Sequence, residues 1–200
     1  MNLGIAVPAR DLVHTGFTRS LCNLTNRLTR LSIDFDIHFV MSSVICEART
    51  QLTKLCLENN HTHTLWLDSD MHFPSTIFEN LISHKKEIVA ATYSTRYAPY
   101  RNVAFTDKEN MNARLEATQG LHKVWAVGMG CMLVDNEVYK QIPKPWYSHY
   151  YNKLEDSFSG EDIYFCDNCY NHGIDVYVDA SASQKLSHFG LSSRMLKDVQ

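Results

Sequence analysis

The first 94 residues alternate short apolar strands with amphipathic helical segments, and this alternation limits the possible folds more than any other feature. Residues 3–7 and 36–44 are apolar runs typical of strands, and leucines at helical spacing in residues 20–31 predict a helix between them. The pattern continues with a helix at 46–59, a strand at 64–67, a helix at 75–83 and a strand at 87–94. This order predicts the α/β class, with a mainly parallel sheet and helices on both faces.

The second half of the chain has a different pattern, which predicts antiparallel strands. Residues 101–105 and 113–135 read as such strands, with a loop at 107–112 between them. A helix is expected from Gly160 onward, and a short strand at 174–179 follows it. We therefore expect residues 1–200 to form a single α/β domain with an added antiparallel element.

Composition and charge exclude several classes of function. The chain has 19 Lys and Arg against 22 Asp and Glu, a net charge of −3, so it lacks the basic field that holds a nucleic-acid backbone. No apolar run approaches the roughly 20 residues of a membrane helix, and the first residues lack the pattern of a signal peptide. We expect no membrane span in this chain, a cytoplasmic location, and six reduced cysteines that are too sparse for a disulfide scaffold.

The strongest chemical signal is Asp68-Ser69-Asp70, which directly follows a buried strand. Two carboxylates at the end of such a strand need a cation or hydrogen-bond donors to offset their charge. A bare D-x-D is more often a solvated turn, but ligands of α/β sheets bind where parallel strands end. Residues 8–10 and 42–43 follow strands in the same way, so we expect them at the same crevice.

Glu161 and Asp162 form a second acidic pair, at the expected start of a helix. Helix N-termini favour carboxylates, so a plain helix start is one interpretation. The functional interpretation makes one acid a general base that accepts a proton from a substrate hydroxyl. His188, near the end of the chain, is either structural or the ligand that completes a metal site begun by carboxylates.

Other motifs carry weaker signals. Cys166 and Cys169 form a lone C-x-x-C inside the helix that starts at Glu161, so a metal or redox role is not expected. His61 and His63 fall in a polar turn and are expected to be solvated. The glycines at 128 and 130 lack the third glycine of a dinucleotide fingerprint, and they are expected to let a substrate approach the backbone.

Taken together, these segments resemble the nucleotide-sugar glycosyltransferases of the GT-A fold, in the broad style of family 2. The resemblance spans nearly the whole chain, and its specificity lies in the order and spacing of several motifs: IAVPAR, CEARTQL, LWLDSDMHFP, EIVAATYSTRYAPY, VGMGCMLVDNEVYKQIPKPW, GEDIYFCDNCYNHGIDVYVD and KLSHFG. It implies a Rossmann-like nucleotide-binding half at about 1–100 and a donor-sugar and acceptor half at about 101–200. The Q-x-x-R-W element of processive members is absent, which indicates transfer of one sugar at a time.

The resemblance also implies roles for individual residues. Asp68, Asp70 and His188 match the shell of a divalent cation, Mn²⁺ or Mg²⁺, and Asp162 matches the base of inverting members. Other residues match positions around the donor and acceptor: Pro8, Ala9 and Arg10 around the base and ribose, Arg49 near the nucleobase, Gly128, Met129 and Gly130 under the donor sugar, Glu161 on a bound acceptor or donor sugar, and Trp146 at the acceptor edge. Ser42 and Ser69, at the strand ends, are also expected to bind the donor.

The expected reaction is metal-dependent transfer of one sugar from a nucleoside-diphosphate sugar, with UDP favoured, to a hydroxyl of a glycan, with inversion favoured. The chain resembles a bacterial or virus-encoded cytosolic enzyme, or the catalytic domain of a longer chain. One alternative is a sugar-nucleotide nucleotidyltransferase, although residues 7–16 lack the glycine-rich basic loop of that class. The other is a catalytically silent carbohydrate-binding module on the same fold.

Overall fold

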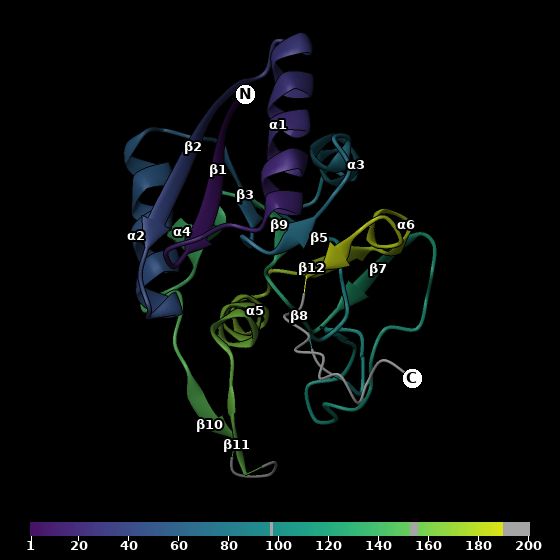
Figure 1. Cartoon of the computed structure of the whole chain (residues 1–200). Helices are drawn as coiled ribbons and strands as arrows, with labels where there is room; N and C mark the ends of the chain where they lie inside the picture. Colours follow the sequence, from purple (N-terminus) through teal and green to yellow (C-terminus); the bar gives the residue numbers. More distant parts are fainter. Residues whose placement is uncertain (97, 153–155, 190–200) are drawn as a thin grey trace.

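A seven-stranded sheet forms the centre of the protein (Figure 1). The computed structural model describes residues 1–96, 98–152 and 156–189. The strands lie in the order β2-β1-β3-β9-β5-β12-β7, and all except β9 and β7 run in the same direction. Their bounds are β1 Asn2–Ala9, β2 Asp34–Met41, β3 His63–Leu67, β5 Ile88–Ala90, β7 Leu121–Val124, β9 Cys131–Asp135 and β12 Val176–Asp179. The predicted α/β class with a mostly parallel sheet is therefore confirmed.

Helices and three short strand pairs complete the fold. The helices are α1 Thr15–Arg30, α2 Ile45–Glu58, α3 Ile77–Ile82, α4 Val138–Gln141, α5 Glu161–Asn171 and α6 Ala180–Ser183. The pairs are β4 Met71–His72 with β13 Ser187–His188, β6 Ala104–Phe105 with β8 Ala126–Val127, and β10 Tyr150–Asn152 with β11 Ser157–Ser159. Figure 1 shows β10 and β11 projecting from the body just before α5 begins.

Side chains alternate across the sheet and create two separate cores. On one face, Leu3, Ile5 and Val7 of β1 pack with the buried leucines of α1 and with α3. On the other face, Ala6 of β1 and Trp66 of β3 pack with α2 and α5. The period of two in each buried strand thus places helices on both faces, as the sequence predicts.

Strand β9 departs from the sequence-based expectation. Residues 113–135 were expected to form an antiparallel element added to the parallel sheet. Instead, β9 is inserted between the parallel strands β3 and β5 and pairs antiparallel with both, while residues 113–120 are irregular apart from one isolated bridge at Arg114. Four consecutive buried residues, Cys131 to Val134, explain its place because only a central strand is covered on both faces.

The exposure of two histidines and the state of the six cysteines were also predicted from the sequence. His61 was expected to be solvated, but its side chain is fully buried, whereas His63 is partly buried. All six cysteines are free, and Cys166 and Cys169 lie inside α5, as expected. Among the described residues, no helix combines the length and apolar character that crossing a membrane requires.

Candidate active site

The carboxyl ends of neighbouring parallel strands bring polar residues together at one edge of the sheet. Pro8 and Ala9 close β1, and the exposed Arg10 follows them. Ser42 follows β2, and its backbone N–H donates to the carbonyl oxygen of Ala9 at 3.2 Å. Asp68 follows β3 directly. This is the edge where the sequence places the crevice, because ligands of such sheets bind beyond the strand ends.

Arg49 of α2 joins two of the predicted acids. Its Nη2 donates to Asp68 Oδ1 at 3.0 Å, and its Nε donates to Glu161 Oε1 at 2.8 Å. The side chain is only 3% exposed, and its guanidinium lies 5.4 Å from the ring centre of Trp66. Arg49 was expected beside a nucleobase. The structure places it inside the protein instead, because two carboxylates and an aromatic ring hold the guanidinium there.

Burial and charge perturb this cluster strongly. Burial alone would lower the pKa of Arg49, but Asp68 and Glu161 raise that pKa above its usual range. Burial raises the pKa of Asp68, and the nearby Glu161 and Asp70 add to the increase that Arg49 opposes. The Nη1 atom of Arg49 is buried and has no hydrogen-bond partner among the described residues. A bound water or a ligand oxygen would satisfy that donor.

Asp70 and His188 meet through the short β4–β13 pair, in which His188 lies opposite Met71. His188 Nε2 lies 3.3 Å from Asp70 Oδ2. The Nδ1 atom of His188 lies 3.1 Å from the carbonyl oxygen of Ser94, so Nδ1 carries the proton and Nε2 faces Asp70. Burial opposes ionisation of Asp70, but His188 and Arg96 lower the pKa of its carboxyl, and Asp70 in turn raises the pKa of His188.

This pair can supply two ligands to a metal ion. A carboxylate oxygen and an imidazole nitrogen approach one point, and a backbone carbonyl fixes the tautomer that leaves the nitrogen lone pair available. The Arg96 guanidinium donates to Asp70 and lies 3.5 Å from His188 Nε2. The positive charge of Arg96 therefore lies beside both predicted ligands. Because these ligands already attract one positive group, they fit a divalent cation.

The second acidic pair lies at the N-terminus of α5, where the sequence places it. Gly160 is the N-cap residue, and a Cβ atom there would lie 2.5 Å from Asp162 Oδ1. The same Oδ1 accepts a hydrogen bond from the backbone N–H of Ile163 at 2.8 Å. Burial, together with the charge of Glu161, raises the pKa of Asp162 to about 6. A carboxylate of this kind suits a general base near neutral pH.

The glycine segment surrounds a tyrosine that sequence reasoning missed. A Cβ at Gly128 or Gly130 would lie 2.6 Å from the hydroxyl of Tyr93, and the N–H of Gly130 donates to this hydroxyl at 2.9 Å. The carbonyl of Gly130 accepts from the N–H of Asp68 at 3.0 Å. These glycines therefore give room to Tyr93 and fix the backbone of Asp68, whereas they were expected to give room to a substrate.

Ser69 uses its carbonyl oxygen to accept from the N–H of His14 at 3.0 Å. Trp146 was expected at an acceptor edge, and this is wrong, because the side chain is buried against Tyr139 and donates to its carbonyl oxygen. Arg96 was missed. It lies in the loop that follows β5, six residues beyond Ala90, and its place in a loop after a parallel strand is the signal that could have found it.

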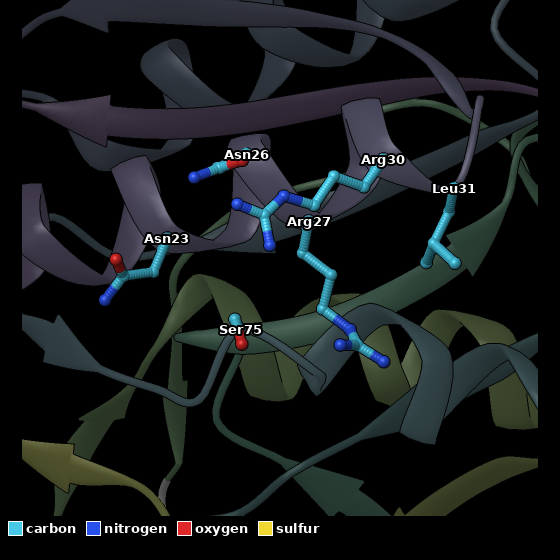
Figure 2. A pocket seen from close by; sticks show the side chains of 6 residues that line it. All are labelled: Asn23, Asn26, Arg27, Arg30, Leu31 and Ser75. Carbon is cyan, nitrogen blue, oxygen red and sulfur yellow. The ribbon is translucent and has the colours of Figure 1, made fainter.

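A separate hollow contains none of the predicted site residues. Figure 2 shows it between α1 and Ser75, with a volume of about 210 Å³ and lined by Asn23, Asn26, Arg27, Arg30, Leu31 and Ser75. Arg27 is already paired with Glu79 at 2.6 Å. The predicted acids of the candidate active site lie elsewhere, at the strand ends.

Comparisons with known proteins agree with this architecture. The family model Anp1, of a glycosyltransferase family, matches residues 39–124. A search of the curated proteins found no match to the sequence.

Among solved structures, A197 from STIV is 15% identical with a TM-score of 0.59, and the alignment covers 98% of each chain. Drosophila β1,4-galactosyltransferase 7, solved as a mutant with manganese, UDP-Gal and xylobiose, is 14% identical with a TM-score of 0.57, over 99% of this chain and 78% of that chain.

GalNAc-T7 with UDP, GalNAc and Mn²⁺ is 8% identical with a TM-score of 0.57. The alignment covers 98% of this chain but only 44% of GalNAc-T7. At these identities the likeness establishes the fold. The chain therefore has the GT-A fold of the nucleotide-sugar glycosyltransferases.

Proposed function

We propose that this protein is a metal-dependent glycosyltransferase that moves one sugar from a nucleoside-diphosphate sugar to an acceptor hydroxyl of a glycan. The observation that carries the proposal is the convergence of Asp68, Asp70 and His188 at the end of β3, with Asp162 linked to them through Arg49 and Glu161. Two of the solved structures of the same fold contain manganese with UDP or UDP-Gal, which favours Mn²⁺ and a UDP-sugar here.

The residues divide into a donor group and an acceptor group. Asp70 and His188 would hold Mn²⁺ or Mg²⁺, with Asp68 beside them, and the ion would supply Lewis-acid stabilisation of the departing diphosphate. Arg10 and Ser42, which follow β1 and β2, would border the nucleoside. Arg49 keeps Asp68 and Glu161 in fixed positions by its two hydrogen bonds.

Asp162 is the proposed base. Its raised pKa, about 6, leaves it ionised at pH 7 to 8 yet more basic than an ordinary aspartate, so it can accept the proton of the acceptor hydroxyl. A base contributes about 10²–10⁴-fold to such a transfer. An acid in this role supports an inverting reaction, in which the acceptor attacks the face opposite the leaving diphosphate.

The acceptor side is proposed to include the β10–β11 hairpin. Strand β11 ends at Ser159, immediately before Gly160 and the acidic pair. Phe158 and Tyr151 are exposed on this hairpin, with ring centres 5.3 Å apart. These exposed aromatic rings, on the strands that lead into the acidic pair, would take the role that was expected for Trp146 and pack against the apolar face of a sugar.

Thermal unfolding with a panel of nucleotides and nucleotide sugars, each with Mn²⁺ and with EDTA, tests the proposal. One diphosphate sugar should stabilise the protein by about 2.7 kcal/mol at a hundredfold excess over Kd, and only with metal. The Asp70→Ala variant should lose this stabilisation and the release of nucleoside diphosphate. Stabilisation by nucleoside triphosphates alone would indicate a nucleotidyltransferase, and a lack of any stabilisation would indicate a silent module.

A further inference from the structure

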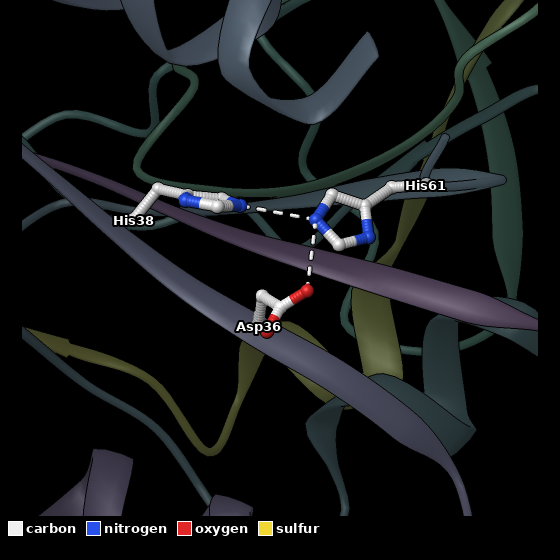
Figure 3. A group of neighbouring side chains, drawn as sticks. All are labelled: Asp36, His38 and His61. Carbon is white, nitrogen blue, oxygen red and sulfur yellow. Dashed lines mark hydrogen bonds and ion pairs between the residues drawn. The ribbon is translucent and has the colours of Figure 1, made fainter. Parts of the chain in front are cut away.

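Two histidines and an aspartate meet on the α2 face of the sheet, away from the strand ends that form the candidate active site. Asp36 and His38 project from β2, and His61 lies in the turn between α2 and β3 (Figure 3). Asp36 lies opposite Gly4 in the β1–β2 register, and that register ends five residues later, at Met41. The cluster therefore belongs to a different part of the sheet from Asp68 and Asp70.

The three ligand atoms are spaced as the ligands of one ion are. His38 Nε2 lies 3.0 Å from His61 Nε2, and His61 Nε2 lies 3.6 Å from Asp36 Oδ2. All three atoms fall within 4.8 Å of one another. In a tetrahedral Zn²⁺ site with bonds of about 2.0–2.1 Å, two ligand atoms are about 3.3 Å apart, and the observed spacings lie on either side of this value.

The surroundings fix His61 in the tautomer that a metal requires. Asn2 Nδ2 donates to the carbonyl oxygen of Asn59 at 3.4 Å, which leaves Asn2 Oδ1 facing His61. This oxygen lies 2.9 Å from His61 Nδ1, and an amide oxygen only accepts, so Nδ1 carries the proton. In the neutral ring Nε2 then presents its lone pair to His38 and Asp36. An outer acceptor that orients a histidine in this way is typical of metal sites.

The backbone makes room for this arrangement. A Cβ at Gly4 would lie 2.7 Å from Cδ2 of His61, so the ring occupies the space that a side chain on β1 would fill. The His61 side chain is fully buried, whereas the Asp36 side chain is 61% exposed. One side of the cluster is therefore fixed by packing, and the other side is open to ions from solvent.

We propose that Asp36, His38 and His61 form a Zn²⁺ site, with water in the fourth position, that is separate from the Mn²⁺ or Mg²⁺ site of the transferase. Two imidazoles and one carboxylate suit Zn²⁺ better than Mg²⁺, which prefers oxygen ligands. The ion would tie the edge strand β2, whose one partner among the described strands is β1, to the turn that leads into β3. Its role would be to hold that edge, so its loss need not affect the chemistry at Asp70.

Metal content after equilibrium dialysis against Zn²⁺ tests the proposal, and the Asp70→Ala background removes the other candidate site. We expect one Zn²⁺ per chain in Asp70→Ala, and none when His38→Gln is added. Asp34→Asn is the matched control, because Asp34 is an exposed acid on the same strand and face, two residues from Asp36. This control should keep the ion, and its loss there would overturn the assignment, as would retention in the His38→Gln double variant.

Two further measurements separate a site from indirect effects. Asn2→Ala leaves all three ligands in place, and it should weaken Zn²⁺ binding by about 10- to 100-fold because it removes the group that orients His61. Unchanged affinity in this variant would contradict the proposed tautomer and with it the site. Bound Co²⁺ should show ligand-field absorption without a thiolate charge-transfer band. Such a band would place the ion on cysteine and overturn the proposal, and circular dichroism checks that each variant is folded.

Discussion

Replacing Asp162 with asparagine should stabilise the protein while it removes transfer. Burial and the charge of Glu161 raise the pKa of Asp162 from 3.8 to about 6, so the folded state holds an ionised carboxylate at a cost. Each pKa unit corresponds to about 1.36 kcal/mol, which gives a cost of about 2 to 3 kcal/mol above pH 7. Asparagine has the same shape, keeps an oxygen that can accept from the N–H of Ile163, and carries no charge.

The sign of the effect follows from the direction of the shift. Because the folded pKa is higher than the unfolded one, the folded state binds the proton more tightly, and wild-type stability falls as pH rises from about 4 to about 6. The variant lacks this titration. The two proteins should therefore differ little at pH 3.5 and most at pH 8.

Thermal unfolding in EDTA at several pH values measures the difference. For a chain of this size, 1 kcal/mol corresponds to about 2–4 °C, so Asp162→Asn should melt about 5–10 °C higher at pH 8. Asp11→Asn, at an exposed acid, is the control and should show no such gain. Equal or lower stability of Asp162→Asn at pH 8 would refute the electrostatic reasoning, and retained transfer would refute the base assignment.

Three further predictions concern the charged and aromatic groups of the site. Arg49→Ala should destabilise the protein by about 3–5 kcal/mol in urea unfolding, since it leaves Asp68 and Glu161 without their buried partner, and a loss below 1 kcal/mol would contradict the pairing. Arg96→Ala should tighten Mn²⁺ binding in a calorimetric titration, because the guanidinium contacts the same atom of Asp70 that faces His188, and weaker binding would show that Arg96 helps to hold the ion's site. Phe158→Ala should raise the KM for the acceptor and leave the donor-induced thermal shift unchanged, and an equal loss of both would exclude an acceptor role for the hairpin.

The parts of the site that follow strands could be predicted from the sequence. Asp68 and Asp70 come after a buried apolar strand, and Arg10 and Ser42 follow neighbouring parallel strands, so the parallel topology itself places them at one edge. The position of His188 is different. Its distance of 118 residues from Asp70 is bridged by the two-residue pair β4–β13, and only the resemblance to a known family indicated that they meet.

The features that the sequence could not predict depend on contacts that the local sequence does not encode. The apolar run of β9 indicates a central strand, but such a run reads the same whether its neighbours are parallel or antiparallel, so its antiparallel direction between β3 and β5 left no mark in its residues. Arg49 carries no local sign of its partners, because Glu161 lies 112 residues away. A tryptophan can lie in the core or on the surface, and its residue type does not distinguish the two. In the structure Trp146 packs against Tyr139 and is buried.

The charges of the candidate site explain why a divalent cation should matter for stability as well as for transfer. Four carboxylates, at positions 68, 70, 161 and 162, gather around two guanidinium groups, Arg49 and Arg96, so the site carries a formal charge of −2 when His188 is neutral and every acid is ionised. Like charges held together cost folding free energy, and a bound divalent cation offsets that cost in the folded state alone. The gain in melting temperature from Mn²⁺ should therefore grow from pH 5 to pH 8, as Asp162 ionises and His188 loses its proton, and a gain that is flat with pH would mean that neither group shares the field of the ion.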